Sequence, residues 1–446
     1  MNRIVKSKSQ ISVIGLGFVG LPMSILLADK LKHYNVIGLE KKNSHGRNLV
    51  RKINNKIFPI TSADKKLEKK FIKVINKNFF STLNKETLFK SNVIFTSVNF
   101  DGDNLNKNLN EIKKLTKLIF TYSKPRTLII FESTFIPGTI NKIIIPFAKK
   151  IVSKRKLNLE DFFVIYSYER IMPGANYYNS ICNTDRIYSG INNISKKKFK
   201  DFFKKIINKK NKLIELDSIF ECETSKILEN SYRAINICMI DEWTKFSILN
   251  NIDLIKIIDS IKRRKTHKNL MYPGLGMGGY CLTKDPQFIN YSKFFTKKKN
   301  NFPFIDLTTK TSKIISNTAI YFFKKNIKNK KFKKTIVFGY SYKNDIGDIR
   351  NSQSVIFVEK IKKFLNSKID IYDPYVKNKN ILNEKPNLKK YDLIIFCTNH
   401  SIYKNINYKN IKKKAVIFDL NNILSSKKIK KLRIRNIVYA LGRRND

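Results

Sequence analysis

The sequence is poor in several residue types, and each scarcity excludes a class of protein. Glycine contributes only 16 of 446 residues and cysteine five, which excludes a collagen-like repeat and a disulfide-stabilised scaffold. No apolar run reaches the ~20 residues that a membrane-spanning helix needs, so we expect no membrane partner. Acidic residues are also scarce. The 34 Asp and Glu stand against 89 Lys and Arg, which gives a net charge of +55.

Cysteine and histidine are too scattered to predict a metal site or a disulfide framework. The cysteines are odd in number, form no CxxC pair and fit no zinc-binding spacing, and the four histidines lie far apart. Unpaired thiols are typical of a reducing compartment, so we expect a cytoplasmic protein without a metal. The cysteines are Cys182, Cys222, Cys238, Cys281 and Cys397.

The basic excess has two interpretations. Lys and Arg that neutralise phosphates supply most of the non-specific affinity for nucleic acid. Alternatively, the enrichment in Lys, Asn, Ile, Phe and Tyr reflects AT-rich codons and spreads charge over an ordinary protein surface. The sequence shows no ribonucleoprotein motif, helix-turn-helix signature or zinc finger, and its lysine runs lie mainly outside the motifs described below. We therefore expect no nucleic-acid partner.

The order of apolar runs predicts two α/β blocks around a helical middle. With 42% hydrophobic and 12% aromatic residues the chain can bury large cores, and at roughly 150 residues per domain its length suggests about three domains. Strands that alternate with helices favour parallel sheets covered on both faces. The predicted fold class is α/β, with two Rossmann-type doubly wound domains joined by a central helical domain with a long helix. The expected domains are residues 1–216, 217–328 and 329–446.

Apolar runs and turn residues place the individual elements. The first block has expected strands at 11–14, 35–39, 93–98, 127–131, 162–166 and 213–216, and helices at 22–31, 106–122 and 195–212. Residues 11–28 resemble a signal peptide, but glycines and Pro22 interrupt them, so we favour a strand, a glycine turn and a helix. Helix is expected over 218–261. After a Lys- and Asn-rich joint at 324–334, strands are expected at 335–339, 369–372, 393–397, 415–419 and 437–440.

One apolar stripe runs along the expected long helix and is predicted to be buried. Its members recur at steps of three and four. Burial inside one subunit and burial against a second copy both fit this pattern. On the opposite face, Lys226, Asn230 and Arg233 either form a solvated surface or point into a cleft. The stripe consists of Leu228, Tyr232, Ile235, Met239, Trp243 and Phe246.

The segment ISVIGLGFVGLP predicts a dinucleotide site. Its G-x-G-x-x-G follows a strand and opens a helix, as in turns that bind a pyrophosphate. An acid twenty residues later accepts hydrogen bonds from a ribose 2′-hydroxyl and repels a 2′-phosphate, which favours NAD over NADP, although Lys41 and Lys42 weaken that preference slightly. The alternative is a glycine turn that binds nothing. The expected cofactor-binding residues are Gly15, Gly17, Phe18, Val19, Gly20 and Glu40.

A second glycine-rich segment, YPGLGMGGYCLTKD, surrounds Cys281. Four glycines beside one thiol indicate backbone that comes close to a ligand. Lys284, three residues later, would favour the nucleophilic thiolate. The alternative is a small buried cysteine in a tight loop.

Six motifs in this order resemble those of the UDP-glucose/GDP-mannose dehydrogenase family over essentially the whole chain. They are VIGLGFVGLP, FESTFIPGT, YERIMPG, SKILENSYRAINICMIDE, GMGGYCLTKD and FGYSYKNDIGDIRNSQS. The resemblance implies a four-electron oxidation of the C6 alcohol of a nucleotide sugar to a carboxylate, with two NAD⁺ used in turn. It also implies that Cys281 attacks the intermediate aldehyde to form a thiohemiacetal and then a thioester.

The resemblance further implies roles for individual residues. Lys226 and Asn230 would stabilise an oxyanion, with Lys226 also moving protons, and Asp285 would support base chemistry. Thr134 and Glu169 would orient water for thioester hydrolysis, and Thr134 would also contact the cofactor, unless it merely caps a helix. Arg350 has an alternative as a salt-bridge partner. The expected substrate-binding residues are Glu169, Arg170, Lys226, Asn230, Tyr272, Gly278, Lys343 and Arg350.

The form of two motifs bears on the substrate. YERIMPG is similar to the branch that acts on N-acetylhexosamine nucleotides, whereas the lysine of GGYCLTKD is typical of the glucose and mannose branches. We expect a UDP-N-acetylhexosamine whose uronate feeds surface polysaccharide synthesis. UDP-glucose, GDP-mannose and a two-electron hydroxyacid dehydrogenase are the alternatives. The resemblance implies at least a homodimer, and it places Arg263, Arg264 and His267 where sugar-binding cations occur. Tyr168 stands where the family usually has proline.

Overall fold

The computed structural model describes residues 9–100, 105–296, 301–328 and 330–445. They divide into two compact units. The first comprises Met1–Ile60, Asp64–Glu229 and Gln287–Asn301, and the second comprises Thr61–Ala63, Asn230–Pro286 and Phe302–Asp446.

The first unit contains an eight-stranded sheet in the order β3-β2-β1-β4-β5-β6-β7-β8. All neighbours are parallel except β6 and β7, which are antiparallel. The order 3-2-1-4-5-6 is that of a doubly wound dinucleotide-binding sheet, and its switch point lies between β1 and β4. The strands are β1 (Ser9–Ile14), β2 (Tyr34–Leu39), β3 (Phe79–Thr82), β4 (Ser91–Thr96), β5 (Leu128–Phe131), β6 (Phe163–Tyr166), β7 (Arg186–Gly190) and β8 (Leu213–Glu215).

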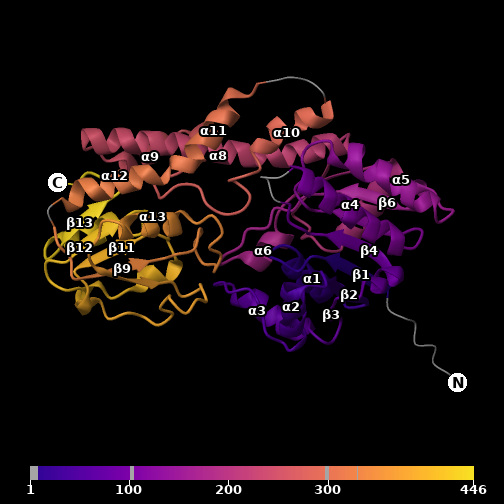
Figure 1. Ribbon diagram of the computed structural model, residues 1–446, viewed down its shortest axis with the longest axis horizontal. Coiled ribbons are helices and arrows are strands. Elements are labelled where there is room, and N and C mark those ends of the chain that lie inside the picture. Colours follow the sequence, from indigo (N-terminus) through magenta and orange to yellow (C-terminus); the bar gives the residue numbers. More distant parts are fainter. Residues whose placement is uncertain (1–8, 101–104, 297–300, 329, 446) are drawn as a thin grey trace. The chain divides into compact units, whose positions relative to one another are not determined.

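Helices cover this sheet because its strands are apolar on both faces and must be buried on both. In Figure 1, α1 and α2 lie beside β1, β2 and β3, and α4 lies near β4 and β6. The helices are α1 (Gly20–Lys30), α2 (Ser44–Asn54), α3 (Lys65–Val74), α4 (Leu105–Tyr122), a π-helix (Ile140–Ile144), α5 (Ile145–Ser153), α6 (Tyr177–Cys182), α7 (Asn193–Phe203) and α10 (Gln287–Thr296).

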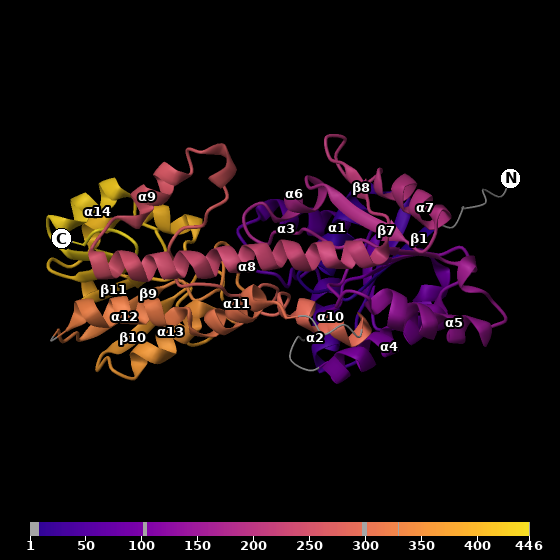
Figure 2. The same ribbon diagram turned by 90° about the horizontal axis from the view of Figure 1, so that it is seen from above.

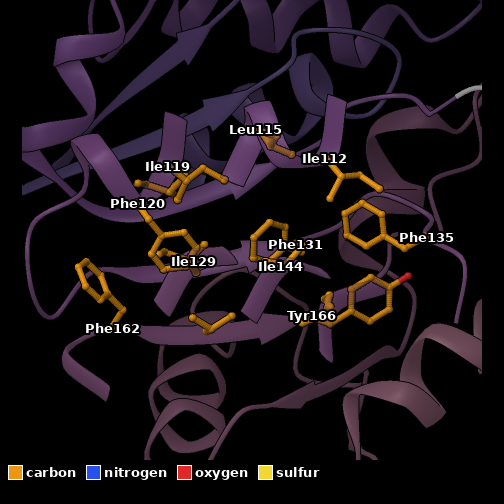
Figure 3. Packing of buried hydrophobic residues seen from close by; sticks show 14 of the residues in the cluster. Ile112, Leu115, Ile119, Phe120, Ile129, Phe131, Phe135, Ile144, Phe162 and Tyr166 are labelled. Atoms are coloured by element: carbon orange, nitrogen blue, oxygen red, sulfur yellow. The ribbon is translucent and has the colours of Figure 1, made fainter. Parts of the chain in front are cut away.

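One core of this unit lies between α4 and the strands β5 and β6. Leu115 and Ile119 on α4 face Ile129 on β5 and Tyr166 on β6 (Figure 3), and all four side chains are buried. Their spacing of four on the helix and the fully apolar run on β5 explain why sequence periodicity located both elements.

The second unit contains a five-stranded, entirely parallel sheet in the order β10-β9-β11-β12-β13. Its strands are β9 (Lys334–Phe338), β10 (Lys368–Tyr372), β11 (Leu393–Phe396), β12 (Val416–Asp419) and β13 (Ile437–Ala440). Its helices are α9 (Leu254–Ile261), α11 (Pro303–Ile314), α12 (Ser316–Ile327), α13 (Gln353–Lys362) and α14 (Ser426–Arg433). Helix α8 (Ile219–Asn250) begins in the first unit and ends in the second, and Figure 2 shows it as one continuous helix.

The predicted fold class is confirmed, with two corrections to predicted helices. The helical middle is not continuous over 218–261. Asn251 has a φ of +48°, which ends α8, and the side chain of Asp253 accepts a hydrogen bond from the backbone of Lys256 to start α9. The stretch predicted as helix over 195–212 ends at Phe203, followed by turns.

The prediction that the α8 stripe is buried is wrong for half of its residues within this chain, whereas Ile235, Met239 and Trp243 are partly buried. Leu228, Tyr232 and Phe246 are 53%, 56% and 61% exposed. The helix instead buries part of its polar face, including Lys226 and Asn230, because those side chains have polar partners there. Periodicity identifies residues that share a face, but it does not tell what covers them.

Candidate functional site

The three glycines between β1 and α1 serve different purposes. Gly15 has a φ of +90°, and a Cβ there would lie 2.6 Å from the carbonyl oxygen of Ser97. A Cβ on Gly20 would lie 1.8 Å from the carbonyl oxygen of Gly15, so only glycine lets α1 begin so close to the turn. At Gly17, a Cβ would meet no atom of the described residues within 4 Å. Gly17 therefore leaves the backbone open towards a ligand, as a pyrophosphate requires.

The start of α1 and the end of β2 complete this site. The N-cap residue, Val19, has no side-chain acceptor for the first N–H groups of the helix, which suits an anion. The preceding residue, Phe18, is held by its carbonyl oxygen, which accepts a hydrogen bond from the Tyr177 hydroxyl. Glu40 Oε1 accepts from the backbone N–H of Leu16 at 2.6 Å, which places the carboxylate beside the glycine turn. These residues fit NAD.

Lys41 was expected to weaken the preference for NAD. Its ammonium instead pairs with Glu111, with 2.6 Å between Nζ and Oε2. The hydrogen bond to Lys41 lowers the pKa of the Glu111 carboxyl. Glu111 thereby neutralises part of the positive charge that follows Glu40.

A buried ion pair joins the end of β5 to β7. Glu132, directly after β5, contacts the guanidinium of Arg186 on β7, and both are almost fully buried. Ser97 Oγ donates to Glu132 Oε2 at 2.8 Å, and Arg186 Nε donates to Ser167 Oγ at 2.8 Å. Burial raises the pKa of Glu132, and Arg186 opposes that shift. The sequence analysis did not identify this pair, although an acidic residue directly after a fully apolar strand could have indicated a buried charge.

The ion pair fixes the turn that carries Thr134. Ser133 Oγ accepts from the backbone N–H of Val98 at 3.0 Å, so the segment is also tied to the end of β4. Thr134 is half-buried and is not the cap of the following helix, whose N-cap is Thr139.

Glu169 and Lys226 lie together in the first unit. Lys226 Nζ donates to the backbone carbonyl of Glu169 at 2.9 Å and lies 3.8 Å from its carboxylate. The ring of Tyr168, which replaces the family's usual proline, lies 5.4 Å from Lys226 Nζ and 5.7 Å from the guanidinium of Arg170. Arg170 pairs with Glu229 at 3.0 Å. The solvated alternative for Lys226 is wrong, because its side chain is buried.

Asn230, Lys284 and Asp285 form a buried cluster in the second unit. Asn230 Nδ2 donates to one carboxylate oxygen of Asp285 at 2.7 Å, and Lys284 Nζ pairs with the other at 2.6 Å. Asp285 is completely buried, and its two partners neutralise and orient it. The solvated alternative is therefore wrong for Asn230 as well.

Cys281 begins the turn that leads to this cluster. Its carbonyl oxygen accepts from the backbone N–H groups of Lys284 at 3.1 Å and Asp285 at 2.9 Å. It is exposed, whereas the other four cysteines are buried, so the alternative of a small buried cysteine is wrong. Lys284, expected to favour the thiolate, directs its ammonium to Asp285 instead.

Near the start of the last α/β block, Lys343 experiences the positive charge of Arg233. Burial lowers the pKa of Lys343, and the neighbouring charge of Arg233 lowers it further. Two neighbouring positive charges repel each other, and an anion that binds near them relieves this repulsion. Sequence reasoning had placed Arg233 only on the polar face of α8 and had not linked it with Lys343.

The remaining predicted residues have structural partners of their own. Arg350 makes a bidentate pair with Asp348, at 2.7–3.1 Å, as its alternative interpretation predicted. The Tyr272 hydroxyl donates to Asp259 at 2.6 Å. Gly278 packs against Tyr342, with 3.0 Å between a Cβ placed there and that of Tyr342. The side chains predicted to bind the sugar as cations are all exposed, namely Arg263, Arg264 and His267.

Among the described residues, no group of three His, Cys, Asp or Glu side chains is arranged to hold a metal ion. No helix in the same part of the chain is both long and apolar enough to cross a membrane.

Three domains described for the UDP-glucose/GDP-mannose dehydrogenase family match the chain in order. The NAD binding domain matches residues 9–207, the central domain residues 221–312 and the UDP binding domain residues 336–426.

Individual relatives resemble almost the entire chain. It is 29% identical to a UDP-N-acetyl-D-mannosamine dehydrogenase of Methanococcus vannielii, covering 95% of this chain and 96% of that protein. It is 26% identical to a UDP-N-acetyl-D-glucosamine 6-dehydrogenase of Pseudomonas aeruginosa, covering 94% and 98%. The fold is similar to a solved UDP-D-ManNAc dehydrogenase of Pyrococcus horikoshii, with a TM-score of 0.79, 24% identity and coverage of 98% and 100%. The chain belongs to the UDP-glucose/GDP-mannose dehydrogenase family and is an NAD-dependent oxidoreductase.

Proposed function

We propose that this enzyme oxidises the C6 alcohol of a UDP-N-acetylhexosamine to the carboxylate through covalent attachment to Cys281. The observation that carries the proposal is the exposed thiol of Cys281 at the start of a turn that leads into the Asn230–Lys284–Asp285 cluster. Within a family of NAD-dependent dehydrogenases, an accessible thiol beside oriented polar groups supports capture of an aldehyde.

NAD⁺, when bound at the glycine turn, would accept the hydride in each of the two oxidations. The chain supplies the other steps. The Cys281 thiolate adds to the aldehyde carbon, and the carbonyl oxygen becomes an alkoxide that Lys226 and Asn230 stabilise. Loss of hydride from this thiohemiacetal gives a thioester. Water then adds to the thioester carbon, and the thiolate leaves with formation of the carboxylate.

The proposed roles agree with the local geometry in each unit. Asp285 accepts a hydrogen bond from Asn230 Nδ2, so the amide of Asn230 is held in one orientation. Glu169 is half-buried beside Lys226, and its carboxylate would accept a proton from the attacking water, with Thr134 orienting that water. Substrate contacts by Arg170, Tyr272, Gly278 and Arg350 stay predictions.

The proposed substrate class is supported by two observations. The charge of Arg233 acts on Lys343, which concentrates positive charge suited to a diphosphate, and the last α/β block matches a domain described as UDP binding. Proteins that resemble the whole chain are named for UDP-N-acetyl-D-mannosamine and UDP-N-acetyl-D-glucosamine. We therefore favour UDP-N-acetylhexosamines over the alternatives UDP-glucose and GDP-mannose.

A substrate panel tests this function. The purified protein is incubated with NAD⁺ and UDP-N-acetylmannosamine, UDP-N-acetylglucosamine, UDP-glucose or GDP-mannose, and both NADH and the product mass are measured. We expect two NADH for each N-acetylhexosamine converted to its uronate. One NADH per molecule would instead favour a two-electron hydroxyacid dehydrogenase. Cys281→Ser should abolish uronate formation, and full turnover by that variant would contradict the covalent route.

We also propose the setting in which the enzyme works. The absence of a disulfide among the described cysteines supports a cytoplasmic location, where the uronate would enter surface polysaccharide synthesis. The exposed apolar stripe of α8 supports a homodimer or a higher homo-oligomer. The division into domains at residues 216 and 328 stays a prediction.

A further inference from the structure

The loop that carries Cys281 is held by a segment of the second unit that lies far along the chain. Asn351 Nδ2 donates to the carbonyl oxygen of Gly279 at 3.2 Å and to Thr283 Oγ1 at 3.1 Å. These two partners precede and follow Cys281 by two residues. Gln353 Nε2 donates to the carbonyl oxygen of Met277 at 2.8 Å. The side-chain amide of Asn351 therefore spans the nucleophile.

Close packing reinforces these hydrogen bonds. A Cβ on Gly278 would lie 2.9 Å from the carbonyl oxygen of Asn351, and a Cβ on Gly279 would lie 2.5 Å from the ring of Tyr342. Gly279 also has a φ of +86°, which glycine adopts readily. The loop backbone thus lies directly against the segment that contains Tyr342 and Asn351.

The backbone at Asn351 is itself specialised. Its φ is +48°, a left-handed conformation in which asparagine is among the few residues found often besides glycine. Glycine would fit the backbone equally well but has no amide to donate. The presence of asparagine is explained by its two hydrogen bonds to the cysteine loop.

We propose that Asn351 is a positioning residue that holds the Cys281 thiol in place for attack on the aldehyde. The inference rests on the proposed function, in which Cys281 is the nucleophile. Asn351 bonds the backbone before the thiol and the Thr283 side chain after it, while the Cys281 carbonyl accepts the turn hydrogen bonds that lead to Asp285. Lys343 lies on the same segment between Tyr342 and Asn351, so nucleotide contact and thiol placement share one piece of backbone.

Hydrogen exchange tests the positioning without any turnover. Asn351→Gly keeps the left-handed backbone and removes the amide. Asn422→Gly is the matched control, because Asn422 has a φ of +50° and its side chain bonds Arg443. We expect amide exchange in residues 279–285 to become about tenfold faster in Asn351→Gly only, as the loss of two ordinary hydrogen bonds predicts. Unchanged exchange, or equal acceleration over the whole second unit, would overturn the proposal.

Kinetics then separate positioning from a merely structural role. With hydroxylamine present to trap free aldehyde, Asn351→Gly should release more trapped aldehyde and form uronate about tenfold more slowly, with an unchanged KM for NAD⁺. Asn351→Asp retains the shape of the side chain but loses the N–H donor, so it should show the same increase in trapped aldehyde and the same slower uronate formation. Aldehyde release no greater than in the unmodified enzyme would refute the inference. If the unmodified enzyme oxidises no nucleotide sugar, the proposed function fails, whereas the exchange result still decides the role of Asn351.

Discussion

Glu223 is a fully buried carboxylate on α8, and its two oxygens accept hydrogen bonds from the backbone N–H groups of Gly138 at 2.6 Å and Ile140 at 3.0 Å. Both hydrogen bonds favour the ionised form. Removal from water acts more strongly in the other direction and raises the pKa of Glu223 to about 8. The residue thus joins the turn after Thr134 to the helix that carries Lys226.

This shifted pKa predicts how stability depends on pH. The pKa in the folded state lies above the ordinary value of 4.5, so between those two values the folded protein holds a proton that the unfolded chain releases. Stability is therefore lost as pH rises through this range, by up to about 1.4 kcal/mol per pH unit. In Glu223→Gln this pH-dependent loss of stability should vanish. Denaturant unfolding of both proteins at a series of pH values measures it. If the free energy of unfolding depended on pH in the same way in both proteins, Glu223 would not be the cause of that dependence.

Lys343 provides a second prediction at the scale of one residue. Its pKa is lowered by burial and by Arg233, so it loses its charge at a lower pH than an ordinary lysine. A diphosphate binds the charged form, and we expect affinity for UDP to fall as pH rises through the lowered pKa. Titration calorimetry on the protein and on Lys343→Arg tests this, because arginine stays charged and should remove the alkaline loss. An equal decline in both proteins would exclude Lys343 as its cause.

At the scale of elements, α8 buries the polar residues Lys226 and Asn230 along with apolar ones, and leaves part of its apolar stripe exposed. Amphipathic helices on the surface of a protein usually have the opposite arrangement. Lys226 and Asn230 are buried because Glu169 and Asp285 offer them partners. The large side chains Leu228, Tyr232 and Phe246 are left on the outside, where a second copy would cover them.

We expect charges in this stripe to disrupt the assembly. Leu228→Glu combined with Phe246→Glu should convert the proposed dimer to a monomer, because each glutamate would lose its hydration in the interface. Sedimentation velocity measures the change. Ile434→Glu is the control, since Ile434 is 81% exposed and lies outside α8. Unaltered sedimentation of the double variant would exclude the stripe as the interface.

At the scale of the whole molecule, the net charge of +55 should affect substrate capture rather than chemistry. Added salt shortens the screening length from about 30 Å at 0.01 M to about 8 Å at 0.15 M. We expect kcat/KM for the UDP-sugar to fall about fivefold over this range while kcat stays constant, because electrostatic steering acts on encounter. Initial rates at several salt concentrations measure it, and a constant kcat/KM would show that the charge does not contribute.

The sequence alone determined those features of this protein that depend on residues close to one another in the chain. Apolar periodicity located the strands of the second sheet and those of the first except β3 and β7, which it missed. G-x-G-x-x-G with Glu40 twenty residues later predicted the NAD site. Motif order indicated the family before any contact was known, and the glycine-rich setting singled out Cys281. These features are local, because turn geometry and strand or helix periodicity act over only a few residues.

Only the tertiary structure decided what covers each face of a helix and which group pairs with each charged side chain. It exposed half of the α8 stripe, buried Lys226 and Asn230, paired Glu132 with Arg186, and brought Asn351 to the cysteine loop. Such contacts join residues that are distant in the sequence. Burial and charge pairing depend on three-dimensional neighbours, which no spacing along a single chain specifies.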